Sequence, residues 1–225
     1  MTLKICTTIF GDMARISNRE KILTEGLRLV HRRGFIGSSV RDIVQAAGVP
    51  QGSFTNHFVS KEAFGLEILD LYFEDTRAVL HLTLRNGDLS PLERLKAYVD
   101  AGIAHMREGE MRSGCFYGNL GAEVPEHSEA LRQRLMQIFD ELAASIADCL
   151  AAAVVAEELA ASTDAGGLAR IIIAALQGSI LLSKVYRDEG PMLQFKRQVF
   201  TSLLRYGSRG GPFETAMAAE LQPAV

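Results

Sequence analysis

Signals that start a helix recur along the whole chain, and this recurrence constrains the fold more than any other feature. Residues 17–20 (Ser-Asn-Arg-Glu) form a capping box, residues 39–42 (Ser-Val-Arg-Asp) resemble a second one, and residues 90–93 (Ser-Pro-Leu-Glu) combine a cap with proline at the first helical position. Apolar residues follow at helical spacing, with no sustained two-residue alternation and no hairpin dipeptide between apolar runs. The sequence therefore predicts an all-α fold. The expected helices are 17–34, 39–47, 51–58, 60–80, 90–106, 114–124, 128–158, 166–187 and 191–206.

Composition and cysteine usage indicate a reduced, intracellular globular protein. The 225 residues are 48% hydrophobic and 23% charged, which is enough apolar material to form a core without disulfides. Cys6, Cys115 and Cys149 are far apart and form no C-x-x-C pair. The N-terminus is a poor signal peptide, and the longest stretch of small apolar residues, 142–156, is shorter than the ~20 residues that span a bilayer. We expect a cytoplasmic protein with no membrane partner.

Charge is distributed unevenly along the chain. Residues 1–61 hold nine basic and four acidic side chains, a net charge of +5, whereas residues 62–225 hold fifteen basic and twenty-three acidic ones, a net charge of −8. A basic head on an acidic body is typical of local contact with a polyanion. A solvated helix surface would give the same count, so charge alone leaves both interpretations open.

The segment 39–58 fits a helix-turn-helix, in which a glycine-containing turn joins two short helices. Its apolar positions, Phe54 and Phe58 among them, can pack the pair against the first helix, so these phenylalanines are predicted to be core. The polar residues then project outward from the start of the second helix: Gln51, Gly52, Ser53, Thr55, Asn56 and His57. A helix N-terminus favours phosphate, and Gln, Asn and Arg side chains can bond base edges. This arrangement predicts binding to double-stranded DNA.

The run from Val40 to Glu62 strongly resembles the DNA-binding segment of tetracycline-repressor (TetR) family regulators. The resemblance is close over residues 15–72 and extends loosely over the rest of the chain. It implies a DNA-binding domain at 15–61, preceded by an extension at 1–14, and a ligand-binding and dimerisation domain at 62–207. The tail at 208–225, with two glycines and two prolines, is expected to be frayed.

Roles for individual residues follow from the same resemblance. It implies base reading by Arg41 and Gln51, close approach of DNA at Gly52, either kind of contact by Asn56, and phosphate contacts by Ser39, Ser53, Thr55, His57 and Lys61. Two positions depart from the family pattern. Thr55 stands where an aromatic residue is usual, which makes its phosphate contact the least secure, and Pro50 stands where Ser or Thr often caps the recognition helix. Arg41 could instead pair with a neighbouring acid, and Lys61 could be an ordinary surface lysine.

The C-terminal body shows no catalytic constellation. Its histidines lack metal-ligand spacing and no glycine-rich phosphate loop follows a strand, so we expect no enzyme activity, no metal and no cofactor. The family resemblance implies a homodimer instead. Alanine clusters at 151–153 and 174–175 would let the helices at 128–158 and 166–187 approach a second copy closely. The alternative is that these are core helices of a monomer.

The segment Met111–Glu123 carries a Gly-Cys-x-x-x-Asn-Leu core similar to the branch of the family that includes acrylate- and N-ethylmaleimide-responsive repressors. In some of that branch the matching cysteine senses electrophiles or oxidants. A cysteine at a helix N-terminus near an arginine gains thiolate character, which makes Cys115 beside Arg112 a candidate sensor. A small buried residue filling a gap is the alternative. Further candidates for lining a ligand pocket are Met106, Phe116, Tyr117, Asn119 and Tyr186.

These observations together predict a homodimeric transcriptional repressor that a small molecule or an electrophile releases from a pseudo-palindromic operator. Two alternatives remain open at this point. An all-α enzyme acting on a small apolar substrate would show turnover without DNA binding. A helical protein-interaction adaptor would bind DNA weakly and without sequence preference.

Overall fold

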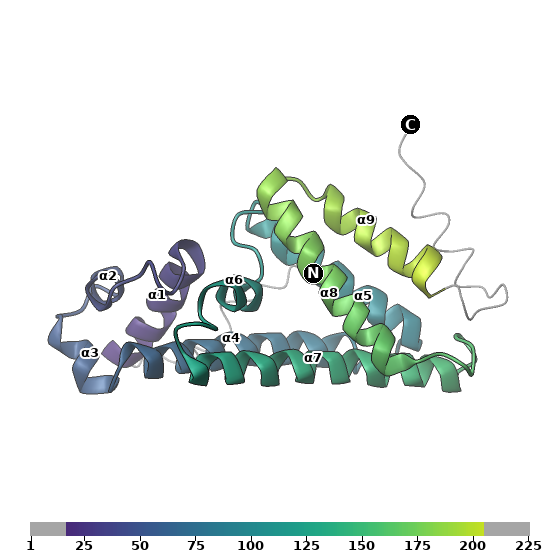
Figure 1. The fold of residues 1–225 in the computed structure, drawn as a ribbon, viewed down its shortest axis with the longest axis horizontal. Coiled ribbons are helices and arrows are strands. Elements are labelled where there is room, and N and C mark those ends of the chain that lie inside the picture. The colour runs from purple at the N-terminus through teal and green to yellow at the C-terminus, as the bar shows by residue number, and fades with distance from the viewer. Residues whose placement is uncertain (1–16, 205–225) are drawn as a thin grey trace. The chain divides into compact units, whose positions relative to one another are not determined.

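The computed structural model describes residues 17–204, and every regular element within them is helical, which confirms the all-α fold class (Figure 1). The helices are α1 (Asn18–Arg33), α2 (Val40–Ala46), α3 (Gly52–His57), α4 (Lys61–Leu82), α5 (Pro91–Glu108), α6 (Phe116–Glu123), α7 (Glu129–Val155), α8 (Ala165–Tyr186) and α9 (Gly190–Gln198). A π-helical turn, Val199–Leu203, follows α9 where the sequence predicted continuous helix to 206. The expected terminal segments, 1–14 and 208–225, lie outside the described residues, as does Cys6.

The chain divides into two compact units. Unit 1 holds residues 1–78 and 116–138, and unit 2 holds residues 79–115 and 139–225, so the division falls within α4 and within α7. The domain boundary at 61/62 that the resemblance implied stays a prediction. Each unit is described separately below.

Capping boxes start the first two helices of unit 1. The Glu20 N–H donates to the Ser17 hydroxyl at 3.2 Å, and the Glu20 carboxylate accepts from the Ser17 N–H at 2.8 Å. The same reciprocal pair forms at α2, where the Asp42 N–H donates to Ser39 at 3.1 Å and the Asp42 carboxylate accepts from the Ser39 N–H at 2.9 Å. Because these bonds satisfy backbone donors that the helices leave unpaired, both starts agree with the sequence-based expectation.

An aromatic core fixes α3 within unit 1. Phe54 of α3 and Phe58, which directly follows the helix, lie one turn apart and are buried together with Phe64 of α4, with ring centroids 5.1–5.6 Å from one another. Fully buried Ile22 of α1 and Ile43 of α2 belong to the same core. Aromatic pairs at this separation stabilise a core beyond their buried area. The prediction that Phe54 and Phe58 are core residues is confirmed.

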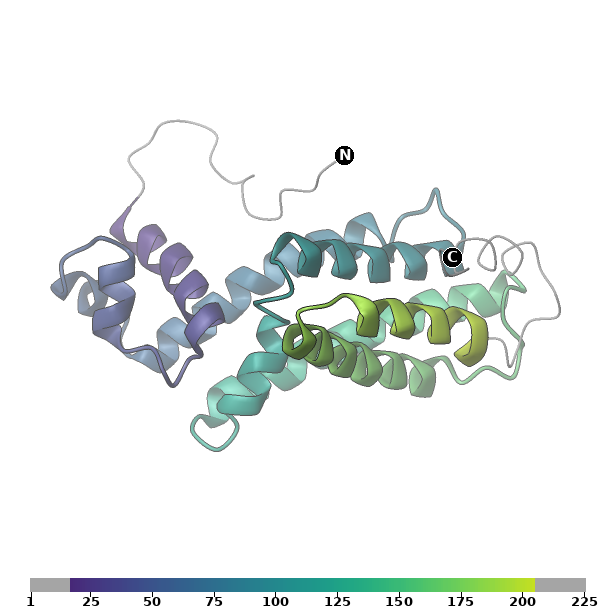
Figure 2. The same ribbon diagram turned by 90° about the horizontal axis from the view of Figure 1, so that it is seen from above.

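Unit 2 is held together by α5, α8 and α9, and α8 and α9 pack side by side (Figures 1 and 2). Lys196 of α9 pairs with Asp100 of α5 at 2.7 Å, and Arg107 of α5 donates two hydrogen bonds to the Glu189 carboxylate, at 2.6 and 2.9 Å. The α8 helix begins at Asp164, whose side chain accepts from the Gly167 N–H at 2.9 Å. Charged contacts thus join helices that the sequence could only order along the chain.

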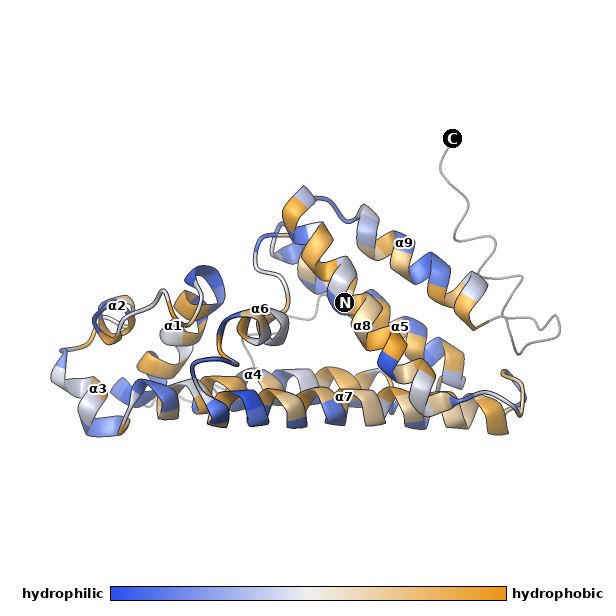
Figure 3. Cartoon of the chain, in the orientation of Figure 1, coloured by the Kyte–Doolittle hydropathy of each residue, from blue (hydrophilic) through white to orange (hydrophobic). Residues whose placement is uncertain are grey.

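The surface of α8 is unusually apolar (Figure 3). Among the described residues it is the one helix long and apolar enough to cross a membrane by length and composition, yet only 22% of its most apolar window is buried. It is not the longest stretch of small apolar residues in the sequence, which is 142–156. Ile171, Leu181, Leu182, Val185 and Tyr186 are all exposed on α8, and so are Ala174, Ala175 and Gly178 between them. These eight residues are called the α8 face below.

Candidate DNA-binding surface and effector segment

The helix-turn-helix presents most of the predicted polar set to solvent. Arg41 of α2 and Gln51, Thr55, Asn56 and His57 of the α3 segment are exposed. Gly52 is exposed too, and a Cβ there would meet nothing within 4 Å, so a partner could approach the backbone closely at this point. This exposed set comes from both α2 and the α3 segment, and the buried Phe54 and Phe58 hold the α3 segment from its inner side.

Arg41 has no ion pair among residues 17–204, so the alternative that it pairs with a neighbouring acid is not what the structure shows. The nearest candidate acid is Asp42, which is engaged in capping α2. Hydrogen bonds from the side chain and backbone of Ser39 lower the pKa of the Asp42 carboxyl. The Arg41 guanidinium therefore remains available to an external acceptor.

The prediction that Ser53 projects outward is wrong. Ser53 is only 8% exposed, and its hydroxyl accepts a hydrogen bond of 3.4 Å from the side-chain amide of Asn18 on α1. Position 53 precedes Phe54 by one residue, and a rotation of about 100° per residue places it at the margin of the buried side. Ser53 contributes to the α1–α3 packing.

Lys61 is neither an ordinary surface lysine nor wholly free for a phosphate. Its ammonium donates to the Phe35 carbonyl at 2.6 Å and lies 4.5 Å from the centroid of the Phe35 ring. Burial lowers the pKa of Lys61, and the charge of Glu123 opposes that shift. Because an ammonium has three donors, one bond to Phe35 leaves others for a phosphate.

The other two hydroxyl groups predicted to contact phosphate, those of Ser39 and Thr55, also have internal partners. The Ser39 hydroxyl caps α2 through the Asp42 N–H and carboxylate, and the Thr55 hydroxyl donates to the Gly52 carbonyl at 3.1 Å. A hydroxyl carries one donor, so either group must turn before it can donate to a phosphate oxygen. Thr55 stands where the family usually has an aromatic residue, and its phosphate contact was therefore expected to be the least secure. The internal bond to Gly52 agrees with that expectation.

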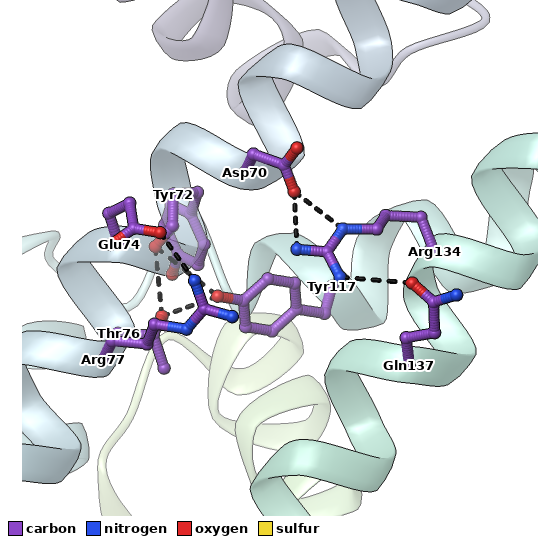
Figure 4. Close-up of polar contacts among 8 residues, drawn as sticks. All are labelled: Asp70, Tyr72, Glu74, Thr76, Arg77, Tyr117, Arg134 and Gln137. Carbon is purple, nitrogen blue, oxygen red and sulfur yellow. Dashed lines mark hydrogen bonds and ion pairs between the residues drawn. The ribbon is translucent and has the colours of Figure 1, made fainter.

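The first turn of α6 is buried in unit 1 and bonded to α4 (Figure 4). The Tyr117 hydroxyl lies 2.6 Å from the Thr76 hydroxyl and donates to the Tyr72 carbonyl at 3.5 Å. The Phe116 ring packs at 5.2 Å from Tyr72 and 5.3 Å from His31. These contacts make both α6 residues part of the packing of unit 1, while Asn119, the third pocket candidate on α6, is half-buried.

A second group of polar contacts holds α7 to α4 in the same unit. Figure 4 shows the Arg134 guanidinium of α7 between Asp70 of α4, at 2.6 Å, and Gln137, at 3.3 Å. Arg77 lies 4.4 Å from the ring centroid of buried Phe73, which Arg134 also approaches at 5.7 Å. The cation–π contacts of Arg77 and Arg134, together with the Arg134–Asp70 ion pair, thus stabilise the packing around Phe73.

The pocket candidates in unit 2 are Met106 and Tyr186, and the structure separates them by exposure. Met106 is buried in α5, whereas Tyr186 is 65% exposed at the end of α8. Tyr186 faces outward from residues 17–204, and its assignment to a ligand pocket stays a prediction. Met106 stays a prediction.

Cys115 is half-buried in unit 2 and directly precedes α6 in the chain. The side-chain amide of Gln177 on α8 donates to its sulfur at 3.5 Å. Arg112, which the sequence analysis proposed as the activating charge, pairs with Glu110 at 3.1 Å in an exposed ion pair. Cys149 differs: burial raises its pKa to about 11, and its thiol donates to the Pro91 carbonyl at 3.1 Å.

Two residues near the candidate sites were not found from the sequence. Gln177 lies 62 residues after Cys115, and Glu123, which accepts from the Ile36 N–H at 3.1 Å, lies 87 residues after its partner. No local motif signals either contact. In the part of the chain from 17 to 204, no group of three or more His, Cys, Asp or Glu side chains could hold a metal ion.

Comparison with known proteins decides between the classes of function. The family of bacterial regulatory proteins called tetR matches residues 22–68, and the tetracyclin repressor-like C-terminal domain matches residues 91–199. The transcriptional repressor DhaR of Mycobacterium sp. (strain GP1) is 35% identical over 192 residues, which cover 85% of this chain and 95% of DhaR. The chain belongs to the TetR family. It is a DNA-binding transcriptional regulator, so the enzyme and adaptor alternatives are not favoured.

Solved structures extend this TetR-family likeness to the whole fold. The regulatory protein TetR from Rhodobacter sphaeroides superimposes with a TM-score of 0.77 at 28% identity, covering 80% of this chain and 96% of that one. Reduced NemR from Escherichia coli gives a TM-score of 0.75 at 28% identity, covering 81% and 94%. The likeness to NemR supports the branch that the segment around Cys115 resembles. Regulators of this family bind DNA operators and small-molecule effectors and act as dimers.

Proposed function

We propose that this chain is a cytoplasmic, homodimeric repressor that binds a pseudo-palindromic operator and leaves it when a small molecule or an electrophile binds. The observation that carries the proposal is the polar, exposed side of α2 and α3 over a phenylalanine core. Each α3 helix enters a major groove, and the two half-sites lie about one helical turn apart. The effector favours a dimer whose two heads are wrongly spaced for the operator.

Within each half-site, base reading falls to Arg41 and Gln51, which are exposed and can form bidentate bonds with guanine and adenine. Asn56 and His57 are exposed beside them, and Gly52 allows close approach of the duplex. Lys61 contacts phosphate through the ammonium N–H donors that do not bond the Phe35 carbonyl. The hydroxyl groups of Ser39 and Thr55 have a secondary role. Ser53 is not part of this surface.

The test of DNA reading selects bound fragments from genomic DNA and then measures binding by fluorescence anisotropy at several salt concentrations. Arg41→Ala and Gln51→Ala should each relax preference at one base position by about 1–3 kcal/mol. Lys61→Ala should weaken binding to all sequences and reduce the salt slope by about 1. Arg85→Ala, an exposed arginine of unit 2, is the control and should bind as wild type. Unchanged affinity, preference and salt slope in all three variants would overturn the assignment.

The α8 face is proposed as the surface that meets the second copy. Its large apolar side chains lie on either side of the small residues Ala174, Ala175 and Gly178, a pattern that allows two helices to approach closely. Of the two alanine clusters singled out in the sequence, both alanines of this one are exposed, whereas the other runs from exposed Ala151 to fully buried Ala153. An apolar face of this extent is not left in water by a soluble chain.

Sedimentation velocity tests the dimer, with Val185→Glu as the disrupting change because Val185 is 64% exposed on α8. The wild type should sediment as a dimer and the variant as a folded monomer with weakened operator binding. Leu82→Glu alters an exposed leucine at the end of α4 and should leave the dimer intact. A Val185→Glu protein that remains dimeric would remove α8 from the interface.

Cys115 is proposed as the residue that senses electrophiles. It is accessible, it precedes the first turn of α6, and an amide donor reaches its sulfur, which favours the thiolate that reacts. N-ethylmaleimide adds to such a thiolate, with the sulfur forming a bond to the alkene carbon and the proton ending on the neighbouring carbon. The product is bulky and forces the start of α6 to move.

Release from DNA is the readout for this proposal. N-ethylmaleimide should release wild-type protein and the Cys149→Ser variant, but not Cys115→Ser. Normal release of Cys115→Ser would overturn the thiol mechanism. Failure to release the wild type would leave a reversibly bound small molecule as the effector.

A further inference from the structure

The last residue of α6 holds the connection that leads into the DNA-binding helices. The Glu123 carboxylate accepts from the backbone N–H of Ile36, in the segment between α1 and α2, at 3.1 Å. The Ile36 side chain is 50% exposed, so apolar packing does little to hold this residue. All of these residues lie in unit 1.

Gly34 shows how closely the carboxylate approaches this connection. A Cβ at position 34 would lie 2.5 and 2.8 Å from the two Glu123 oxygens, and the glycine has a φ of +85° that side chains rarely adopt. The carboxylate therefore occupies space beside the chain that only glycine leaves open. The contact is built from both sides, since α6 brings the acceptor and the connection lacks the side chain that would block it.

Lys61 joins the same site from α4. Its ammonium donates to the carbonyl of Phe35, the residue between Gly34 and Ile36. The negative charge of Glu123 favours the protonated ammonium and so raises the pKa of Lys61 against the effect of burial. The Phe35 ring in turn packs where a Cβ at Gly65 would lie 2.7 Å from it. Carboxylate and ammonium thus hold opposite sides of one peptide group, the amide that joins Phe35 to Ile36: Glu123 accepts its N–H and Lys61 donates to its C=O.

This segment continues directly into Ser39, the cap of α2, and Arg41, the proposed base-reading residue. Glu123 also ends the helix that Cys115 precedes, so it is the point where α6 reaches the reading helices. We propose that Glu123 is a positioning residue that holds α2 in its DNA-reading position and passes a displacement of α6 to it. The proposal rests on DNA reading by α2 and α3, and its sensing arm rests on the thiol mechanism.

Three variants separate the parts of this contact. Glu123→Ala removes the acceptor and the charge, whereas Glu123→Gln keeps an acceptor oxygen and removes the charge only. Glu126→Gln neutralises an exposed acid three residues further on and is the matched control. Thermal unfolding of each variant confirms that the protein is folded before binding is measured.

Hydrogen exchange and operator binding are the first readouts. In Glu123→Ala, amide exchange in the peptide covering 34–39 should accelerate, and operator affinity should fall about fivefold, as expected for one lost hydrogen bond. Glu123→Gln should restore slow exchange and most of the affinity, and Glu126→Gln should match wild type. Unchanged exchange and affinity in Glu123→Ala would overturn the proposal. A loss of operator affinity in Glu123→Gln as large as that in Glu123→Ala would overturn it too.

Release by N-ethylmaleimide is the second readout, which a purely structural role would not change. The reagent lowers operator affinity by a certain factor in wild type. If α6 acts through Glu123, the corresponding factor in Glu123→Ala should be at least five times smaller. An equal reduction in both proteins would overturn the coupling. If wild type is not released at all, the thiol mechanism fails, and the exchange and affinity measurements still decide whether Glu123 positions α2.

Discussion

Replacing Gly34 by alanine tests the geometry of the α1–α2 connection directly. Gly34 ends α1, donating its N–H to the Val30 carbonyl at 2.8 Å, with φ 85° and ψ 158°. That region of the backbone map is essentially restricted to glycine, and forcing a side chain into it costs about 1–3 kcal/mol. The new methyl group would also displace the Glu123 carboxylate, whose bond to the Ile36 N–H contributes about 1 kcal/mol. The variant should therefore lose about 2–4 kcal/mol of unfolding free energy.

Urea unfolding followed by circular dichroism measures this loss, and the Glu123→Ala background separates its two causes. In that background the carboxylate is already absent, so Gly34→Ala should cost about 1 kcal/mol less than it does alone. Gly121→Ala is the control because a Cβ there meets nothing within 4 Å on α6, and alanine should stabilise the helix by up to about 1 kcal/mol. A Gly34→Ala cost below about 0.5 kcal/mol, or an unchanged cost in the double variant, would refute the reasoning.

Three other outcomes follow from the hydrogen bonds and pKa values. Hydrogen bonds from Ser39 lower the pKa of Asp42 below its ordinary 3.8. The Asp42 carboxylate therefore stabilises the fold above pH 3.8, and this stabilisation is lost as the pH falls through the lowered pKa. Ser39→Ala removes the cause of the shift, so the urea midpoint of this variant should fall less steeply between pH 5 and 3 than that of wild type. Tyr117→Phe should cost about 1 kcal/mol in urea unfolding, because it leaves the Thr76 hydroxyl without its 2.6 Å partner; a cost near zero would contradict the bond. Cys149, with a pKa of about 11, should react with maleimide far more slowly than the other described cysteine at pH 7, as mass spectrometry of peptides would show.

Local signals in the sequence predicted the elements and the exposed polar set, because each depends on residues a few positions apart. The capping boxes at Ser17 and Ser39 require only a partner three residues later, and both formed. The burial of Phe54 follows from helical spacing. Ser53 was misplaced because it lies at the margin of the same helical side, where spacing alone does not determine whether α1 covers a residue.

Contacts between distant segments could not be predicted in the same way. The amide of Gln177 at Cys115 and the carboxylate of Glu123 at Ile36 depend on how helices pack, and one sequence without its fold gives no sign of either. Exposure of Tyr186 was missed for a related reason, since an apolar helix that meets a second copy has the same composition as one buried in its own chain. Composition indicates that such a surface will be covered, and only the fold shows that residues 17–204 leave it exposed.

The length of α6 explains why contacts at its two ends are decisive. With eight residues, Phe116–Glu123, it is too short to be a stable helix alone, so packing determines its position. Tyr117 bonds its first turn to α4, and Glu123 bonds its last residue to the α1–α2 connection. The coupling proposed for Glu123 requires these eight residues to move as one body, so that a displacement of the first turn reaches the last residue. Under that proposal, chemistry at the preceding cysteine changes the position of α2 without any contact between an effector and the DNA-reading side chains.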